Sequence, residues 1–276
     1  MPQIPGYDII DVLSRAGGTG IVYFGINRRN GYPVAIKQLY ASHAQNSAIV
    51  DAFRNEAINY VYIQHPCITK LVDFVELNGT CYLIMEYLQG QTLDEFQRTQ
   101  TGPMPDEMAG SIILKVLETV GYIHNVSTPF SPHGILHLDI KPSNIMIGQN
   151  LSVKVMDMGI SSTISNHNTN QRVCGTPAFM PPEQAHRGQL GPYTDIFAIG
   201  VTFYTMLVAH LPFVGNSTKE IWKKIENADY PAPSVYYPFV NKRFEPIIRK
   251  ALEPDPALRY QTCAQMAIDI NKVLNQ

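Results

Sequence analysis

A short loop and the end of one strand contain the side chains of this sequence that could act on a phosphate group. The segment HLDIKPSN at 137–144 offers a general base in Asp139, a cation in Lys141 and a neutral oxygen ligand in Asn144. Asp157 ends the stretch VKVMD, and a glycine follows two residues later. Asn144 and Asp157 supply hard oxygen ligands of the kind that Mg²⁺ prefers. Each residue alone is more often a helix cap or a turn residue, so only the set as a whole predicts a site.

A lysine on an apolar strand and a glutamate on an apolar helix face precede this loop. Lys37 ends the stretch VAIK, whose other side chains are apolar, so it needs a pocket or a partner. Glu56 comes three residues after Phe53 and four before Tyr60, on the apolar side of the helix expected there. A lone glutamate would ordinarily be an exposed helix charge. A carboxylate on an apolar face costs several kcal/mol unless it is paired, so we predict that Glu56 pairs with Lys37.

A glycine-rich segment near the N-terminus could bind an anion. The sequence RAGGTG at 15–20 places Gly17, Gly18 and Gly20 between two expected strands. Glycines there let backbone N–H groups approach a phosphate without obstruction by a Cβ atom. Taken alone, the same sequence is equally consistent with a glycine-rich hairpin turn.

The elements that must position these residues change in character along the chain. Short runs of β-branched and aromatic residues predict strands first, and helical spacing of apolar residues dominates later. This order indicates the α+β class, with a small β-rich lobe over 1–88, a larger α-helical lobe over 89–276 and a hinge near Glu86–Gly90. The expected strands are 7–13, 21–26, 34–39, 71–77 and 81–86, with a short stranded region at 135–156, and the expected helices are 48–63, 108–124, 195–209, 218–227, 244–252 and 263–274.

Composition excludes several other classes of protein. The chain has 276 residues, 45% of them hydrophobic, and a formal net charge of −2, so it is neither a disordered chain nor a basic nucleic-acid-binding protein. The stretch 196–209 is shorter than the roughly 20 apolar residues that span a bilayer. The first ten residues lack the basic and apolar regions of a signal peptide. Four scattered cysteines without a CxxC pair predict no zinc site and fit a reducing, cytoplasmic compartment.

The ordered set of glycine-rich loop, Lys, Glu, Asp-x-Lys-x-x-Asn and Asp-x-Gly resembles the eukaryotic-like protein kinase family. The resemblance extends from about Tyr7 to Leu274, and the compact length is similar to that of bacterial-type members. The segment CGTPAFMPPE at 174–183 resembles the family's substrate-docking loop, and DIFAIG at 195–200 resembles its buried anchoring helix. The segment DPALR at 255–259 resembles the one whose arginine pairs with the glutamate of the docking loop. The resemblance implies a bilobal protein-kinase-like fold and an ion pair between Arg259 and Glu183.

The resemblance also implies a role for each candidate residue. Lys37 would hold the α- and β-phosphates of ATP and pair with Glu56, while Asp139 would accept the proton of the substrate hydroxyl. Lys141 would neutralise charge on the transferred phosphoryl group. The remaining implied roles are metal binding by Asn144 and Asp157, with Mg²⁺ as the metal and Mn²⁺ as an alternative, and hydrogen bonding of Thr176 to Asp139 and Lys141.

Contacts to the nucleotide base follow from the same resemblance. The hinge Glu86–Leu88 would bond adenine through its backbone, Met85 would close the back of the pocket, and Val22, Ala35 and Met146 would enclose the base. An apolar spine anchored by Asp195 would link the lobes through Tyr60, Leu71, His137 and Met158.

The substrate class is implied as protein serine and threonine hydroxyls. Lys141 two residues after Asp139, together with Gly175-Thr176-Pro177, is similar to serine/threonine kinases and differs from tyrosine kinases. Two alternatives remain. One is a pseudokinase that binds nucleotide and acts as a signalling scaffold. The other is a small-molecule kinase of similar fold, which should lack the docking segment found here.

Three positions depart from the family pattern. Arg15 stands where the first loop glycine is usual, which predicts weaker nucleotide affinity, and Met158 replaces an aromatic ring. Leu138 replaces the arginine that clamps a phosphorylated residue in the activation segment, and the secondary basic positions are occupied by Ala52 and Ser162. We therefore expect that basal activity does not require phosphorylation of Ser161, Ser162, Thr163, Ser165 or Thr169.

Overall fold

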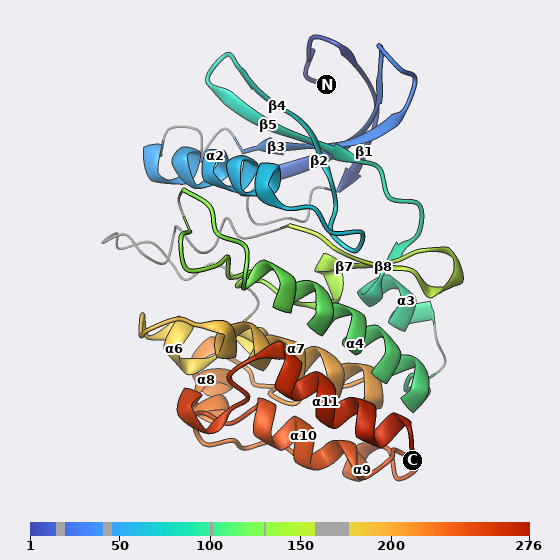
Figure 1. The fold of residues 1–276 in the computed structure, drawn as a ribbon, viewed down its shortest axis with the longest axis vertical. Coiled ribbons are helices and arrows are strands. Elements are labelled where there is room, and N and C mark those ends of the chain that lie inside the picture. Colours follow the sequence, from blue (N-terminus) through green and yellow to red (C-terminus); the bar gives the residue numbers. More distant parts are fainter. Residues whose placement is uncertain (15–19, 41–45, 100–101, 130, 158–176) are drawn as a thin grey trace.

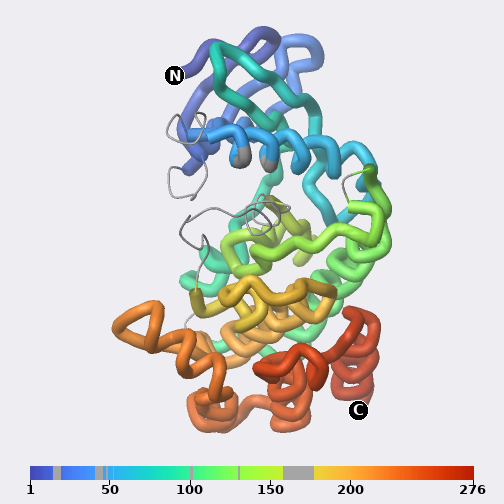
Figure 2. Tube along the Cα trace, turned by 90° about the vertical axis from the view of Figure 1, so that its left-hand side faces the viewer, coloured from blue at the N-terminus to red at the C-terminus, as the bar shows by residue number. Residues whose placement is uncertain are grey.

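The chain folds into a β-sheet lobe above a helical lobe, with the N-terminus and the C-terminus at opposite ends (Figure 1). This computed structural model describes residues 1–14, 20–40, 46–99, 102–129, 131–157 and 177–276. Figure 2, at right angles to the first view, shows α2 (Ser47–Tyr62) lying across the space between the sheet and the green segments of the lower lobe. We call the two parts the N-lobe and the C-lobe.

The N-lobe is an antiparallel sheet of five strands in the order β1-β2-β3-β5-β4. Each strand predicted from the sequence is confirmed to within one residue. At the β4–β5 hairpin, Asn78 (φ 51°) and Gly79 (φ 73°) both take left-handed backbone conformations, as the tightest two-residue turns require. The strands are β1 (Tyr7–Ser14), β2 (Gly20–Asn27), β3 (Pro33–Leu39), β4 (Leu71–Leu77) and β5 (Thr80–Glu86).

Side chains along the N-lobe strands alternate between the two faces of the sheet, so the N-lobe has two apolar clusters, one on each face. Leu39 and Leu83 pack on one face with Phe53 and Ala57 of α2. The other face carries its own apolar cluster, which includes Ile36. Because side chains alternate between faces, the β3 residues on the α2 side are those numbered 35, 37 and 39. This geometry points Lys37 toward α2 and the C-lobe.

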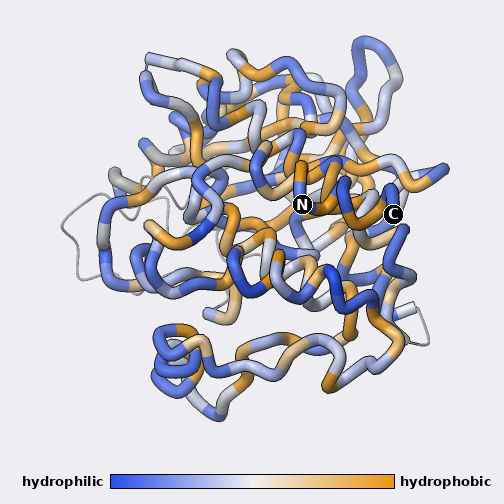
Figure 3. The backbone as a smooth tube through the Cα atoms, turned by 60° about the horizontal axis from the view of Figure 1, so that its bottom comes forward, coloured by the Kyte–Doolittle hydropathy of each residue, from blue (hydrophilic) through white to orange (hydrophobic). Residues whose placement is uncertain are grey.

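The C-lobe is built around α4 (Asp106–Ile123) and α7 (Pro192–Val208), whose buried faces share one large core. Hydrophobic segments concentrate in the interior of the trace, and the outer loops are mostly hydrophilic (Figure 3). The other C-lobe helices are α3 (Leu93–Thr99), α6 (Pro182–Ala185), α8 (Thr218–Glu226), α9 (Pro233–Tyr236), α10 (Phe244–Ala251) and α11 (Cys263–Leu274), and the 3₁₀ turns are η1 (Pro142–Asn144), η2 (Gln149–Leu151), η3 (Pro177–Phe179) and η4 (Pro256–Leu258).

A small three-stranded sheet lies at the top of the C-lobe. It consists of β6 (Gln91–Thr92), β7 (Ile145–Ile147) and β8 (Val153–Val155), in that order. Ile68, in the segment that joins α2 to β4, forms a parallel bridge with Val155 of β8. The N-lobe is therefore attached to the C-lobe by backbone pairing behind the cleft as well as by the hinge.

Two helix starts differ by more than one residue from the expected positions. The helix α4 begins at Asp106, two residues early, because Asp106 and Glu107 are acidic residues suited to a first turn. The helix α7 begins at Pro192, three residues early, since proline has no backbone N–H to lose at the first helical position. Among the described residues, no helix combines the length and apolarity needed to cross a bilayer.

Candidate active site

The N-lobe side chains that are expected to lie near the nucleotide share one face of the sheet. Val22 lies directly opposite Lys37, and Ala35 lies directly opposite Met85. Residues opposite one another on antiparallel strands share a face, and so do Ala35 and Lys37, which are two apart on β3. The four side chains therefore project together toward the C-lobe.

Lys37 forms an ion pair with the carboxylate at the end of β8. Its Nζ lies 2.8 Å from Oδ1 of Asp157, and the two side chains are 8% and 34% exposed. Burial alone would lower the pKa of Lys37, but the carboxylates of Asp157 and Glu56 raise it above its usual value. Burial likewise opposes ionisation of Asp157, yet the charge of Lys37 lowers its pKa. Both groups are therefore charged at neutral pH.

Glu56 lies on the buried face of α2, as predicted, but the expected direct pair with Lys37 is not formed. Its side chain is 2% exposed, and neither carboxylate oxygen has a hydrogen-bond partner among the described residues. Burial raises the pKa of Glu56 to about 8, although the charge of Lys37 acts to lower it. The correction has a physical reason: Lys37 already contacts the ionised Asp157, and a protonated Glu56 is less costly to bury than an ionised one.

Asp139 is held in the loop 137–144 by two of its predicted neighbours. Lys141 donates from Nζ to both carboxylate oxygens of Asp139 at 2.8 Å. Asn144 donates from Nδ2 to the backbone oxygen and to Oδ2 of Asp139, again at 2.8 Å. These bonds fix the carboxylate and leave Oδ1 of Asn144 free of them as an acceptor. The structure thus brings together the base, the cation and the amide.

Asp195 anchors the loop from below through its buried carboxylate. Its Oδ2 accepts from the backbone N–H of His137 at 2.8 Å, and its Oδ1 accepts from that of Leu138 at 2.7 Å. The side chain of His124 contacts the same Oδ2 at 2.8 Å. Burial opposes ionisation of Asp195, but the bond from His124 and its charge lower the pKa. Asp195 thus holds His137, one member of the predicted spine.

Sequence reasoning missed two residues that hold this loop. Gln184, which follows the predicted docking motif directly, donates from Nε2 to the backbone oxygen of Leu138 at 2.9 Å. Leu138 takes a left-handed backbone conformation (φ 59°) outside any helix or strand. Its N–H and its oxygen are therefore bonded by side chains, those of Asp195 and Gln184. His124 is the second missed residue. No spacing rule distinguishes these side chains from ordinary polar helix residues.

The predicted pair between Glu183 and Arg259 is confirmed. Arg259 donates from Nη1 and Nη2 to the two oxygens of Glu183 at 2.6 and 3.0 Å. Its side chain is fully buried and also donates to the backbone oxygens of Glu253 and Pro254. The guanidinium carbon lies 5.0 Å from the ring centre of Phe197 in α7. This pair links the docking segment to the C-lobe core.

The expected spine is described in part. Tyr60 and Leu71 belong to one apolar cluster between α2 and the C-lobe, and His137 is fully buried nearby in the loop that Asp195 anchors. Ring atom Nε2 of His137 lies 3.0 Å from the backbone oxygen of Met156, and burial lowers its pKa. Met158 lies outside the described residues.

Several predicted residues fall outside the part of the chain that the structure describes. They are Arg15, Gly17, Gly18, Thr176 and the five candidate phosphorylation sites at 161–169. Gly20 is described, and a Cβ atom there would lie 2.0 Å from the backbone oxygen of Gln38 on β3. Gly20 is therefore required by the close approach of two strands, whatever its part in phosphate binding.

The residues present fit a metal-bound nucleotide. Asp157 uses Oδ1 for Lys37, which leaves Oδ2, and Asn144 donates through Nδ2, which leaves Oδ1, so two hard oxygen atoms are not used by these bonds. The buried carboxyl group of Glu56 has no hydrogen-bond partner among the described residues and can still make one. Within the described ranges no cluster of three or more His, Cys, Asp or Glu side chains forms an alternative metal site.

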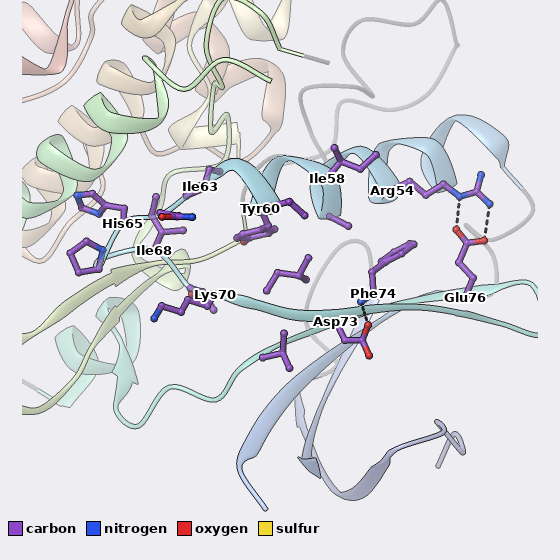
Figure 4. A pocket seen from close by; sticks show the side chains of 17 residues that line it. Arg54, Ile58, Tyr60, Ile63, His65, Ile68, Lys70, Asp73, Phe74 and Glu76 are labelled. Carbon is purple, nitrogen blue, oxygen red and sulfur yellow. Dashed lines mark hydrogen bonds and ion pairs between the residues drawn. The ribbon is translucent and has the colours of Figure 1, made fainter. Parts of the chain in front are cut away.

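A separate hollow of about 1110 Å³ lies behind the cleft, between α2 and β4 (Figure 4). Arg54 and Glu76 form a bidentate ion pair at one end, at 2.6 and 2.9 Å. Tyr60 lines it, and His65 lies at the end toward the C-lobe. The residues predicted to bind nucleotide, metal or substrate hydroxyl do not line this hollow, so it is distinct from the candidate active site.

Comparison with known proteins identifies the arrangement. The family model of the protein kinase domain matches residues 15–269. The chain belongs to the protein kinase family. This family uses ATP and a divalent metal ion.

Several protein kinases of bacteria are similar over nearly the whole chain. A probable serine/threonine-protein kinase of Streptomyces coelicolor, SCO3848, is 32% identical over 98% of this chain and 40% of its own length. PknB of Mycobacterium leprae is 31% identical over 97% of the chain and 43% of its own length, and PrkC of Bacillus subtilis is 33% identical over 96% and 40%. The chain thus spans about two fifths of the length of these relatives.

A solved protein kinase structure has the same fold. The kinase domain of Mycobacterium tuberculosis PknI, crystallised as a double mutant, aligns with a TM-score of 0.77 over 97% of this chain and 96% of that chain, at 21% identity. The bilobal fold expected from the sequence is confirmed.

Proposed function

We propose that this chain transfers the γ-phosphoryl group of ATP to serine and threonine hydroxyl groups of proteins, with Mg²⁺ as the metal and Mn²⁺ as an alternative. The observation that supports this most is the convergence of Lys37, Asp157, Asp139, Lys141 and Asn144 from three separate segments on one cleft. Such a set does little covalent chemistry and acts by positioning and electrostatic stabilisation.

Each side chain has a distinct part in this proposal. The bound metal–nucleotide complex supplies the phosphoryl group and neutralises charge on its oxygens. Asp139 accepts the proton of the attacking hydroxyl, and Lys141, 2.8 Å from that carboxylate, stabilises charge on the group in transfer. Asn144 and Asp157 hold the metal. Lys37, which Asp157 holds at 2.8 Å, contacts the α- and β-phosphates, and Glu56 is a buried neighbour of this lysine.

The adenine site lies between the lobes. The backbone of Glu86–Leu88 bonds the base, with Met85 behind it. Val22 and Ala35 cover it from the sheet face that also carries Lys37, and Met146 of β7 supports it from below. The roles that the resemblance implies for Gly17, Gly18 and Gly20 at the phosphates, and for Thr176 beside Asp139 and Lys141, are part of this proposal. The lobes 1–88 and 89–276 together form this one catalytic unit.

The acceptor class is supported by the relatives. Those compared above are named serine/threonine kinases, and Lys141 holds Asp139 directly, as expected for this class. The substrates proposed are therefore proteins that present serine or threonine. The thiols of Cys67, Cys81 and Cys263 are free, which supports a reducing, cytoplasmic compartment.

The experiment that tests this function is transfer from γ-labelled ATP to generic acceptor proteins, with and without Mg²⁺, followed by mapping of the modified residues. We expect label on serine and threonine, and none when EDTA removes the metal. Label confined to tyrosine or to a small molecule would contradict the acceptor class.

A pseudokinase is the second candidate, and one contact favours it. Lys37 bonds Asp157 while Glu56 has no partner among the described residues, so the Lys37–Glu56 pair that the resemblance implies is missing. A pseudokinase would bind ATP in the same assay mixture and transfer no label to any acceptor, including itself.

A further inference from the structure

The side chain of Glu86 connects the hinge to both lobes. Its Oε1 accepts hydrogen bonds from Nζ of Lys154 on β8 and from the backbone N–H of Lys70, the latter at 3.1 Å. The backbone N–H of Glu86 donates in return to the backbone oxygen of Lys70 at 3.0 Å. Glu86 is 30% exposed and Lys154 25% exposed, so both are shielded more than an ordinary surface pair.

Lys154 comes from the floor of the proposed adenine site. It lies directly opposite Met146 in the β7–β8 pair, so the two side chains share a face. The neighbours Val153 and Val155 are buried on the opposite face. The ammonium of Lys154 therefore rises beside Met146 and reaches the residue that begins the hinge.

The backbone around this ion pair is already linked across the lobes. Thr69 donates its N–H to the backbone oxygen of Val155 at 3.2 Å, and Val155 donates its own N–H to Cys67 at 2.8 Å. Figure 4 shows Lys70 on the same segment, between Ile68 and the start of β4. The backbone bonds fix the distance between this segment and β8, whereas Glu86 and Lys154 are the side chains that extend the link to the hinge.

We propose that Glu86 and Lys154 are positioning residues that hold the hinge backbone at the correct height above Met146, and so set the affinity for the adenine base. This inference rests on the proposed nucleotide-binding function. Neither side chain lies among the residues proposed to contact phosphate, metal or the acceptor hydroxyl. Loss of the pair should therefore weaken nucleotide binding and leave the phosphoryl-transfer step unchanged.

The test compares Lys154→Met with the wild-type chain in Kd for ATP-Mg²⁺, KM for ATP and kcat. We expect Kd and KM to rise about five-fold, as for loss of one partly exposed ion pair, with kcat within about two-fold. Lys154→Arg keeps the charge and should retain the wild-type KM. Inhibition by inorganic tripolyphosphate, which has no adenine, should be equal in all three chains.

The controls separate this inference from a general loss of structure. Lys115→Met breaks an exposed ion pair with Glu118 on α4 and should change no constant. If Lys154→Met unfolds at the assay temperature, Glu86→Gln removes the charge while keeping an acceptor for Lys70, and it should give the same rise in KM.

Three results for Lys154→Met would overturn the proposal. They are a Kd for ATP equal to that of the wild-type chain, a fall in kcat as large as the rise in KM, and weaker inhibition by tripolyphosphate than in the wild-type chain. A wild-type chain that binds no ATP would contradict the proposed function itself, which is a different outcome from wild-type binding that the variants leave unchanged.

Discussion

Two carboxylates compete for one lysine at the centre of the cleft. Asp157 contacts Lys37 at 2.8 Å, and Glu56 is buried without a hydrogen bond among the described residues. The left-handed backbone at Asp157 (φ 53°) aims its carboxylate back at β3. The protonation state of Glu56 therefore depends on burial and on the charge of Lys37. That protonation state determines how the stability of the folded chain varies with pH.

Glu56 should make the folded chain less stable as pH rises. Its pKa is raised from the usual 4.5 to about 8, so between these values the folded state retains a proton that the unfolded state has lost. Unfolding then releases a proton, and the free energy of unfolding falls by up to about 1.4 kcal/mol per pH unit across this window. Glu56→Gln should abolish that slope.

Denaturant titrations of both chains at several pH values within that window measure the difference. The Gln variant should gain stability relative to wild type as pH rises. Parallel pH profiles for the two chains would contradict the assignment of a neutral, buried Glu56.

At the scale of elements, motifs and hydrophobic periodicity predicted the helices and strands, but they did not predict which side chains pair. Every main strand and six helices were predicted within a few residues, because alternation and helical spacing report which face is buried. The helix α3 was missed, since its sequence LDEFQRT buries only Leu93 and has no apolar stripe. Periodicity placed Glu56 on the buried face, but it could not rank two carboxylates around Lys37, nor identify Gln184 as a partner of Leu138.

The loop that Leu138 occupies should work without phosphorylation of the activation segment. Leu138 is buried, and its backbone is held by Asp195 and Gln184, so this position offers no cation to a phosphate. We expect phosphatase-treated chain to show the transfer rate of a mock-treated control from the first minute. A lag that disappears after autophosphorylation would contradict this prediction.

The ion pair between Glu183 and Arg259 should dominate the stability of the docking segment. Arg259→Met removes a fully buried guanidinium and leaves Glu183 unpaired, which typically costs about 3–5 kcal/mol. Chemical denaturation measures the change. Arg28→Met, which breaks an exposed pair with Asp8, should show no measurable loss.

The second substitution Glu183→Gln provides a check on the cause. Combined with Arg259→Met, it removes the unpaired buried charge and should recover part of the lost stability. A double variant as unstable as the sum of the two single variants would show that the pair contributes nothing beyond packing.

At the scale of the whole molecule, two lobes with separate cores meet at a cleft. The N-lobe contributes Lys37 from β3 and Glu56 from α2. The C-lobe contributes Asp139, in the loop that Asp195 of α7 holds, together with Asn144 and Asp157. The resemblance to the family predicted which site residues belong to each lobe, because the motifs follow one another along the chain in the order typical of the family. Sequence alone could not predict the contacts between lobes at Glu86 and Lys154, which depend on how the two bodies are placed.

The most direct test of the central claim is a comparison of Asp139→Asn with wild type in both ATP binding and phosphoryl transfer. Asp139 is proposed to accept the hydroxyl proton and does not contact Lys37, so the variant should bind ATP-Mg²⁺ with an unchanged Kd. Its transfer rate should fall by about 10²–10⁴-fold, the usual contribution of a general base. Asp8→Asn, an exposed carboxylate far from the cleft, should retain full activity. Transfer by Asp139→Asn at the wild-type rate would contradict the account.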